Sequence, residues 1–347
     1  MSGRSAFRTI GALWRVAIAS VVGLLTCQGA AMSEIEPSRW AEVMQKAKSE
    51  GHINLYSVAV PQQAERLIQA FNRKYPEIRI NHTRGAGDLP PRVEAEGKAG
   101  ADGADVFIWS DPLWYNRNEE HLLPLDTPSA KAFPKDGGWQ VPSKAAIIAF
   151  APFGILVWNT SFVKEGLKDH RDLLRPELKG RIATREDVTA VVAGYLDFLE
   201  RQLGAEYLRA IGKQQPKFYP TLVPAVQAVA AGEVWAANIG SPTAVQDLKD
   251  QGAPIEWATP APKGFANTWV AAVLRQSRRP NAALVFIDYV LSPEGQTVLN
   301  GQRASGSAIR GLPSTLDVSD YEVFKPEDFP IEVRDRWRRK FDEYFPR

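Results

Sequence analysis

The 347-residue sequence contains a single cysteine, Cys27, which lies close to the N-terminus. The body of the chain therefore has neither a disulfide nor a thiol nucleophile. Only four histidines are present, and none stands in an HExxH or a cysteine–histidine zinc pattern. A GxSxG nucleophile elbow and a GxxxxGK[ST] phosphate loop are also missing. These absences weigh against a zinc enzyme, a hydrolase with a cysteine or serine nucleophile and an NTPase.

The catalytic signals that remain are weak. His82 lies near Arg84, but a solvated loop histidine explains it as well. Glu186 and Asp187 are adjacent carboxylates, and adjacent side chains on a helix point apart, which does not suit acid–base catalysis. The GAG turn at 85–87 has too few glycines to indicate a nucleotide. The sequence therefore predicts no enzyme activity, no cofactor and no metal.

The excess of positive charge lies in the N-terminal segment. Arg4, Arg8 and Arg15 stand within the first 31 residues, where no acidic residue occurs. Without them, 39 basic residues face 40 acidic ones. A net charge near −1 gives no electrostatic reason to expect nucleic acid or an anionic membrane as a partner.

The same segment has the parts of an export signal. The basic residues precede an apolar stretch at 16–25, about ten residues and too short to span a bilayer. Small residues follow at 29–31, so cleavage after Ala31 and a periplasmic protein that begins at Met32 are predicted. An alternative is a lipoprotein tether at Cys27, but Thr26 is a poor fit to the small residue usual before that cysteine.

The length and the order of elements predict two α/β lobes. A chain of this size is too long for one ordinary core. Strands at 52–58, 78–83 and 104–109 are each followed by a loop and a helix, which favours a doubly wound, mostly parallel sheet.

A long apolar strand at 147–159 is predicted to cross into a second α/β region. The strand at 269–274 is expected to return from it, and the crossing strands would form the hinge. The predicted organisation is a signal peptide at 1–31, lobe one at 32–149 and 268–347, lobe two at 150–267, and a ligand cleft between the lobes. The last helix, 331–344, carries an apolar stripe that predicts packing against a lobe.

Several motifs, in this order, resemble a known family. They are INLYS and FNRKYP, then ADVF, then VQAVAAGE, and the most specific one, PNAALVFIDYVLSPEGQ from Pro280 to Gln296. The mature chain resembles the extracellular solute-binding proteins of ABC importers, in the branch with ferric-iron, thiamine and 2-aminoethylphosphonate binders. This resemblance implies a type II periplasmic binding protein fold, a small-molecule ligand and an ABC permease in the inner membrane as partner. A monomer is expected.

In open α/β sheets, ligands bind outside the carboxyl ends of the strands. Loops there offer hydroxyls, amides and free backbone N–H groups ahead of helices, which suits an anionic or strongly polar ligand, although these residues could also be simple N-caps. Trp109 and Asp111 could instead hold a cation, or Trp109 could lie in the core. The predicted ligand-binding residues are Ser57, Val58, Arg84, Gly85, Trp109, Ser110, Asp111, Thr184, Asp187, Thr189, Asn238, Ser241, Thr268 and Trp269.

The resemblance also predicts what is not bound. The iron-binding members hold the metal with two adjacent tyrosines and a histidine, but here those places read Gly240, Ser241 and Pro242, and Ala59 and Val60. A bare ferric site is therefore not expected. A phosphonate, a phosphorylated compound or a carboxylate is the favoured solute, and a ferric chelate, a polyamine or a thiamine-type compound is the alternative. A periplasmic enzyme or sensor subunit on the same fold remains a further hypothesis.

Overall fold

The computed structural model describes residues 37–85, 87–261 and 263–346. The predicted signal segment and Cys27 lie outside these ranges. Within them, no helix combines the length and the apolar character that crossing a membrane requires.

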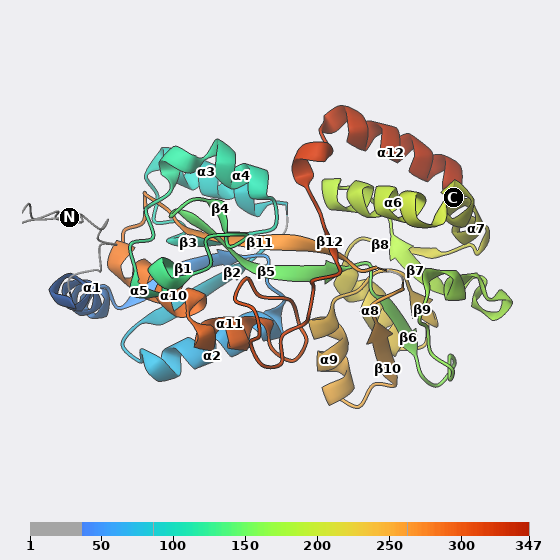
Figure 1. The fold of residues 1–347 in the computed structure, drawn as a ribbon, viewed down its shortest axis with the longest axis horizontal. Coiled ribbons are helices and arrows are strands. Elements are labelled where there is room, and N and C mark those ends of the chain that lie inside the picture. The colour runs from blue at the N-terminus through green and yellow to red at the C-terminus, as the bar shows by residue number, and fades with distance from the viewer. Residues whose placement is uncertain (1–36, 86, 262, 347) are drawn as a thin grey trace, which may run out of the picture. The chain divides into compact units, whose positions relative to one another are not determined.

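The first sheet is mixed. Its strand order is β2-β1-β3-β11-β5-β4, and β12 pairs with β11 (Figure 1). The strands β1 and β2 are parallel, as are β1 and β3, whereas β11 is antiparallel to both β3 and β5. The bounds are β1 (His52–Ser57), β2 (Arg79–Arg84), β3 (Val106–Trp109), β4 (Trp139–Val141), β5 (Ala145–Phe153), β11 (Phe265–Val273) and β12 (Glu322–Val323).

Helices cover both faces of this sheet. Successive strand residues point to opposite sides, and apolar side chains on both sides pack against helices. Leu55 and Ile108 pack with one group of helices, which includes α2 and α10, while Tyr56 and Phe107 pack with α3 and α4. Figure 1 shows these two layers. The bounds are α1 (Pro37–Glu50), α2 (Pro61–Lys74), α3 (Leu89–Ala99), α4 (Pro112–Arg117), η1 (Glu119–His121), α5 (Pro128–Ala132), α10 (Pro280–Leu291) and α11 (Pro293–Asn300).

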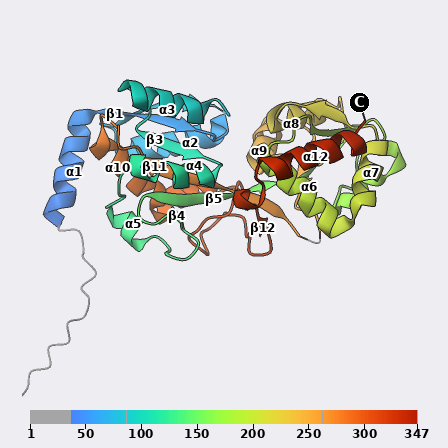
Figure 2. The ribbon, with the colours of Figure 1, turned by 90° about the horizontal axis from the view of Figure 1, so that it is seen from above.

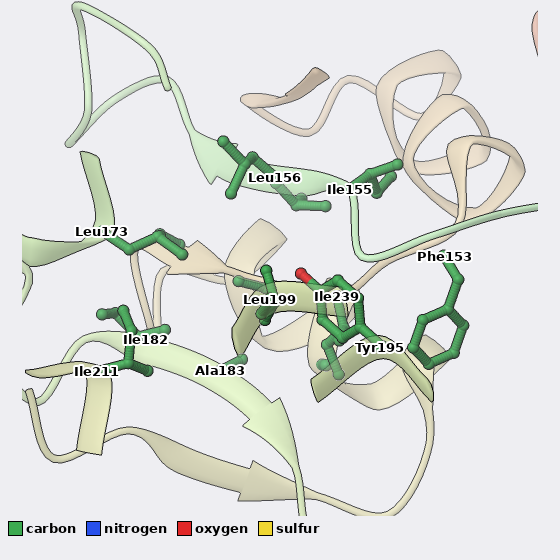
Figure 3. Packing of buried hydrophobic residues seen from close by; sticks show 14 of the residues in the cluster. Phe153, Ile155, Leu156, Leu173, Ile182, Ala183, Tyr195, Leu199, Ile211 and Ile239 are labelled. Carbon is green, nitrogen blue, oxygen red and sulfur yellow. The ribbon is translucent and has the colours of Figure 1, made fainter. Parts of the chain in front are cut away.

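The second sheet has the order β10-β6-β9-β7-β8. The strand β7 is parallel to β8 and β9, and β6 is antiparallel to β9 and β10. Figure 3 shows part of its apolar core, in which Ile182, Tyr195 and Leu199 pack together. The bounds are β6 (Leu156–Asn159), η2 (His170–Leu174), η3 (Pro176–Leu178), β7 (Ile182–Arg185), α6 (Ala190–Leu203), α7 (Ala205–Lys213), β8 (Lys217–Tyr219), α8 (Leu222–Ala230), β9 (Ala236–Ala237), α9 (Pro242–Asp250) and β10 (Ile255–Ala258).

Strands and helices alternate as predicted, but the sheets are less parallel than expected. Each sheet contains antiparallel pairs. In the first sheet, β4 is antiparallel to β5, and two further antiparallel pairs arise because the returning strand β11 lies between β3 and β5. The order of elements along the chain could be seen in the sequence. The insertion of a distant strand into the middle of the sheet could not.

The two sheets share the strands that connect them. The strand β5 runs on through Gly154 and Ile155 into β6, and β11 returns. Because β11 is antiparallel to β3 and β5, the strands β1 to β3 run in the direction of β5, toward the second sheet. The strands β7, β8 and β9 run opposite to β6, back toward the first sheet. The carboxyl ends of both sets of parallel strands therefore face each other.

The last helix, α12 (Ile331–Tyr344), follows η4 (Pro326–Asp328) and packs on α6 and α7 (Figure 2). Its buried side chains Trp337, Phe341 and Tyr344 belong to the second core, although the predicted boundaries assign this helix to lobe one. The predicted apolar stripe is present. After β12, which pairs with β11 of the first sheet, the chain returns to the second sheet, and the stripe of α12 packs on the helices there. The exact division into lobes stays a proposal, since the described residues form one compact unit.

Candidate ligand cleft

Three predicted loops of the first sheet lie side by side. They follow β1, β2 and β3, whose carboxyl ends are Ser57, Arg84 and Trp109. The N–H of Val58 donates to the carbonyl of Ile108 (3.1 Å), and the N–H of Gly85 donates to the carbonyl of Ser57 (3.2 Å). The backbone thus joins these loops into one edge.

Ser57 is buried at this edge and contacts His82, for which the sequence left a functional role and a solvated loop histidine as alternatives. Its Oγ lies 2.7 Å from Nε2 of His82 and accepts a hydrogen bond from the N–H of Ala59 (3.3 Å). Burial and the positive charge of Arg84 lower the pKa of His82, which favours the neutral ring. The solvated histidine considered at this position is therefore a half-buried one that fixes the Ser57 hydroxyl.

The other residues of this edge serve partly structural purposes. Arg84 is exposed, and its Nε donates to the carbonyl of Ala59 (3.2 Å). The half-buried Trp109 stacks on Phe107, with 6.0 Å between ring centroids. Asp111 caps α4 by accepting from the N–H of Leu113 (3.0 Å), and Ser110 beside it is half-buried.

Asn238 and Thr184 lie at the carboxyl ends of two neighbouring strands of the second sheet. Both are buried, and the N–H of Asn238 donates to the carbonyl of Ala183 (3.3 Å). The Oδ1 atom of Asn238 has no hydrogen-bond partner among the described residues, although the residue is only 4% exposed. A buried amide oxygen without a donor is costly, so Asn238 has unused binding capacity.

Tyr195 of α6 holds Asn238 in place. Its hydroxyl donates to the carbonyl of Asn238 (2.9 Å) and lies 3.3 Å from the carbonyl of Gly154. Burial raises the pKa of Tyr195 and keeps the hydroxyl protonated as a donor. One side chain thus links the crossing point of the chain to the end of β9. Figure 3 shows Tyr195 with Phe153 and Ile239, which precede Gly154 and follow Asn238 in the chain.

Ser241 stands at the N-cap of α9, but its side chain makes no capping hydrogen bond. The half-buried hydroxyl is therefore available to another partner. A side chain at Gly240 has no room, because a Cβ there would lie 2.6 Å from Cγ2 of Val157. No group of metal-ligating side chains occurs among the residues that the structure describes.

Asp187 and Thr189, which were predicted to bind ligand, lie beside the helix α12. Asp187 pairs with Arg185 (Nε to Oδ1, 2.9 Å), and the Thr189 hydroxyl caps α6 by accepting from the N–H of Val192 (3.4 Å). Both line a depression of about 310 Å³ together with Arg338 and other residues of α12. The sequence could not place α12 here, so it gave no sign of this neighbour.

Thr268 and Trp269 lie within β11, where they pair with Phe150 and Ala149 of β5. Both are buried, and Trp269 belongs to the first core. Their position on the crossing strand agrees with the predicted strand, and the ring of Trp269 is used in packing.

A cavity of about 340 Å³ lies between the elements that follow these loops. Val60, Pro61 and Gln62 at the start of α2 form one wall, and α8 and α9 form the other. Nη1 of Arg66 on α2 lies 3.8 Å from Oδ1 of Asp247 on α9, and burial raises the pKa of this Asp247 carboxyl. The helices α2 and α9 thus meet next to the loops at the facing strand ends, where a ligand of an open α/β fold is expected.

The family profile described as bacterial extracellular solute-binding protein matches residues 54–302. The chain belongs to this family. The matched range contains both sheets except β12 and the first two residues of β1, and every predicted ligand-binding residue. The predicted family resemblance is confirmed.

Solved structures show that this solute-binding protein has the predicted two-lobed type II fold. The substrate-binding protein of an ABC transporter from Agrobacterium tumefaciens is 16% identical, with a TM-score of 0.71 over 84% of this chain and 94% of that one. The periplasmic binding protein AfuA from Actinobacillus pleuropneumoniae, with fructose-6-phosphate bound, is 20% identical (TM-score 0.65; 85% and 99%). Iron-bound HitA from Pseudomonas aeruginosa is also 20% identical (TM-score 0.64; 84% and 99%).

Proposed function

We propose that this protein is the receptor of an ABC importer, which captures one small polar organic solute in the periplasm and delivers it to a permease in the inner membrane. The observation that carries the proposal is the convergence of strand ends from both sheets, with unused polar groups at Asn238 and Ser241. Closure of the lobes around the solute by a hinge motion would bring these loops together.

The chemistry of the loops favours an anionic or strongly polar solute. Backbone N–H groups at helix starts, the Ser241 hydroxyl and the exposed Arg84 offer donors to a phosphonate, a phosphorylated compound or a carboxylate. Asn238 Oδ1 would accept from a hydroxyl or amino group of the same solute. The likeness to AfuA, which is a fructose-6-phosphate complex, is compatible with this class of solute.

Iron remains a weaker alternative. HitA is an iron-bound relative, but Gly240, packed against Val157, has no space for a metal-binding tyrosine. A ferric chelate needs no such side chain and stays among the alternatives, as do polyamines and thiamine-type compounds.

A thermal-shift screen tests the proposal. Phosphonates, sugar phosphates, carboxylates, polyamines and ferric salts would be added to the purified protein, and a compound that binds only the native state raises its melting temperature. We expect a phosphonate, phosphate or carboxylate to do so. A shift with ferric iron alone would overturn the argument from the missing tyrosines.

The stabilising compound would then be titrated into Asn238→Ala/Ser241→Ala. We expect at least about a tenfold loss of affinity, because two polar contacts are removed. The matched control, Ser49→Ala/Asn81→Ala, removes the same kinds of group from α1 and from the middle of β2. Equal affinities of the two double variants would count against this cleft.

Recovery of the bound compound distinguishes the transport proposal from the enzyme hypothesis. After several hours with the purified protein, the compound should be found unchanged by mass spectrometry. Its conversion into a product would show that the transport proposal is wrong.

We also propose that the mature protein begins at Met32. Mass spectrometry of the protein from a periplasmic fraction should give this N-terminus. A lipid-modified Cys27 at the N-terminus, in a membrane fraction, would favour the lipoprotein alternative.

A further inference from the structure

A second cavity lies away from the cleft, in the layer of α3 and α4. It has a volume of about 530 Å³ and is closed on its third side by residues 274–276, which connect β11 to α10. This volume is in the usual range of small-molecule sites. It shares no lining residue with the cavity between α2, α8 and α9.

The floor of this cavity is apolar and buried. Val93, Trp114 and Leu274 are all buried, and each contributes to the lining. The indole Nε1 of Trp114 donates to Oε1 of Glu94 at 2.9 Å, which ties α4 to α3. Glu94 is the carboxylate of this lining, and the hydrogen bond occupies one of its two oxygens.

The rim is positively charged. Lys98, Arg117 and Arg275 line it, and His121 adds a titratable ring. Lys98 makes no ion pair with a described residue, while Arg117 has only Asp111 at 3.7 Å. The guanidinium of Arg275 donates to two backbone carbonyls, at 2.8 and 3.1 Å, and makes no ion pair with a described residue.

Two further acidic side chains lie near the rim but do not line the cavity. Glu119 pairs with Lys144 at 2.9 Å, outside the lining, and Glu120 lies 3.5 Å from the ring of His121. The lining of the cavity thus contains three cationic side chains and one carboxylate, Glu94, around an apolar floor.

We propose that this cavity is a second binding site, for a small organic anion with an apolar body such as an aromatic carboxylate. The acid group would pair with Lys98 and Arg117, and the ring would cover Val93 and Trp114. The proposal is independent of which solute the cleft takes.

The site is placed to influence the cleft. The helix α3 begins one residue after Asp88, and α4 begins after its cap Asp111, so both walls of the cavity start in loops that follow β2 and β3. An anion on Arg117 also competes with Asp111 for the same guanidinium.

Isothermal titration with naphthalene-2-carboxylate tests the site. We expect saturable one-to-one binding, and about tenfold weaker binding of the neutral analogue 2-naphthalenemethanol, because the charged pair is lost. Lys98→Gln/Arg117→Gln should lose affinity by a similar factor. The control Arg39→Gln/Lys46→Gln removes the same charges from exposed positions of α1 and should bind as the wild type does.

A blocking variant keeps the charges. Gly97 lines the cavity in the helical part of α3. The three atoms nearest to a Cβ there belong to the flexible amide of Gln276, so Gly97→Leu should fold and fill the space. We expect it to abolish binding, whereas Asn238→Ala/Ser241→Ala should leave binding unchanged. The proposal is overturned if the wild type shows no saturable binding, or if the probe binds Gly97→Leu and Lys98→Gln/Arg117→Gln as it binds the wild type.

Discussion

His170 is a polar side chain without polar partners in the second core. It is 1% exposed, and its ring lies between those of Tyr195 and Tyr207, with centroids 6.2 and 6.1 Å away. Neither ring nitrogen has a hydrogen-bond partner among the described residues. Burial lowers the pKa of His170 to about 4, against 6.5 for the free side chain.

This difference makes stability depend on pH. Between pH 6.5 and pH 4, His170 binds a proton in the unfolded state but stays neutral in the folded state. Unfolding therefore becomes more favourable as the pH falls toward 4. The loss amounts to about 3 kcal/mol across this window. In His170→Leu the contribution disappears, and urea unfolding at pH 7 and pH 4.5 should show a smaller loss on acidification than in the wild type.

The control for this experiment is His121→Leu, which changes an exposed histidine. It should lose as much stability on acidification as the wild type. If His170→Leu behaves in the same way as His121→Leu, the ring of His170 is not excluded from protonation in the folded state.

Single residues also show where sequence reasoning stops. The rule that ligands bind at strand ends selected Ser57 and Asn238, and both lie at facing strand ends. It did not select His82, whose contact with Ser57 depends on the parallel register of β1 and β2. The sequence suggests that two strands exist, but it does not state which residues stand beside each other.

The connection between β5 and β6 depends on a glycine. Gly154 has φ of +78°, and a Cβ there would lie 2.2 Å from Cε2 of Tyr195. Gly154→Ala should therefore cost the ordinary strain of a left-handed residue and also displace Tyr195, about 3 kcal/mol together. Urea unfolding measures this cost.

Gly180 offers the matched control. Its φ is +71°, and a Cβ there would meet nothing within 4 Å, so Gly180→Ala should cost only about 1 kcal/mol. Equal costs at both positions would mean that the hydroxyphenyl ring of Tyr195 moves aside freely.

The helix α12 should stabilise the second core. Phe341 of this helix is buried in the second core, and Phe341→Ala should lower the free energy of unfolding by about 3 to 5 kcal/mol. Ile331 on the same helix is 49% exposed, and Ile331→Ala should change stability by less than about 1 kcal/mol. Calorimetry of both variants checks this, and a small effect at Phe341 would contradict the packing of α12.

At the scale of elements, the sequence was most informative about amphipathic patterns. The stripe of Trp337, Phe341 and Tyr344 was visible, as were the apolar positions of α2. What each stripe packs against was not visible, because apolar side chains from either lobe would satisfy it equally well. This is why the sequence assigned α12 to lobe one, whereas the helix packs on α6 and α7.

At the scale of the whole molecule, the contact between α2 and α9 should control access to the cleft. Arg66 and Asp247 face each other there, and in a protein that begins at Met32 the variant Arg66→Cys/Asp247→Cys would contain the only thiols. A short bismaleimide should join them. The compound found by the thermal-shift screen should then no longer raise the melting temperature, while Arg66→Cys and Asp247→Cys alone, treated with the same reagent, should still respond. An unchanged response of the cross-linked protein would show that solute reaches the cleft without separation of α2 from α9.

The position of β11 has a consequence for the order in which the molecule assembles. This strand, Phe265–Val273, is the partner that joins β3 to β5 in the first sheet. More than a hundred residues of the second lobe precede this strand in the chain. During synthesis, the first sheet therefore lacks β11 until the second lobe has been made. Such distant pairings slow folding. The periplasmic receptor proposed above would have to be exported, and slow pairing of β11 would keep its chain unfolded for longer before export.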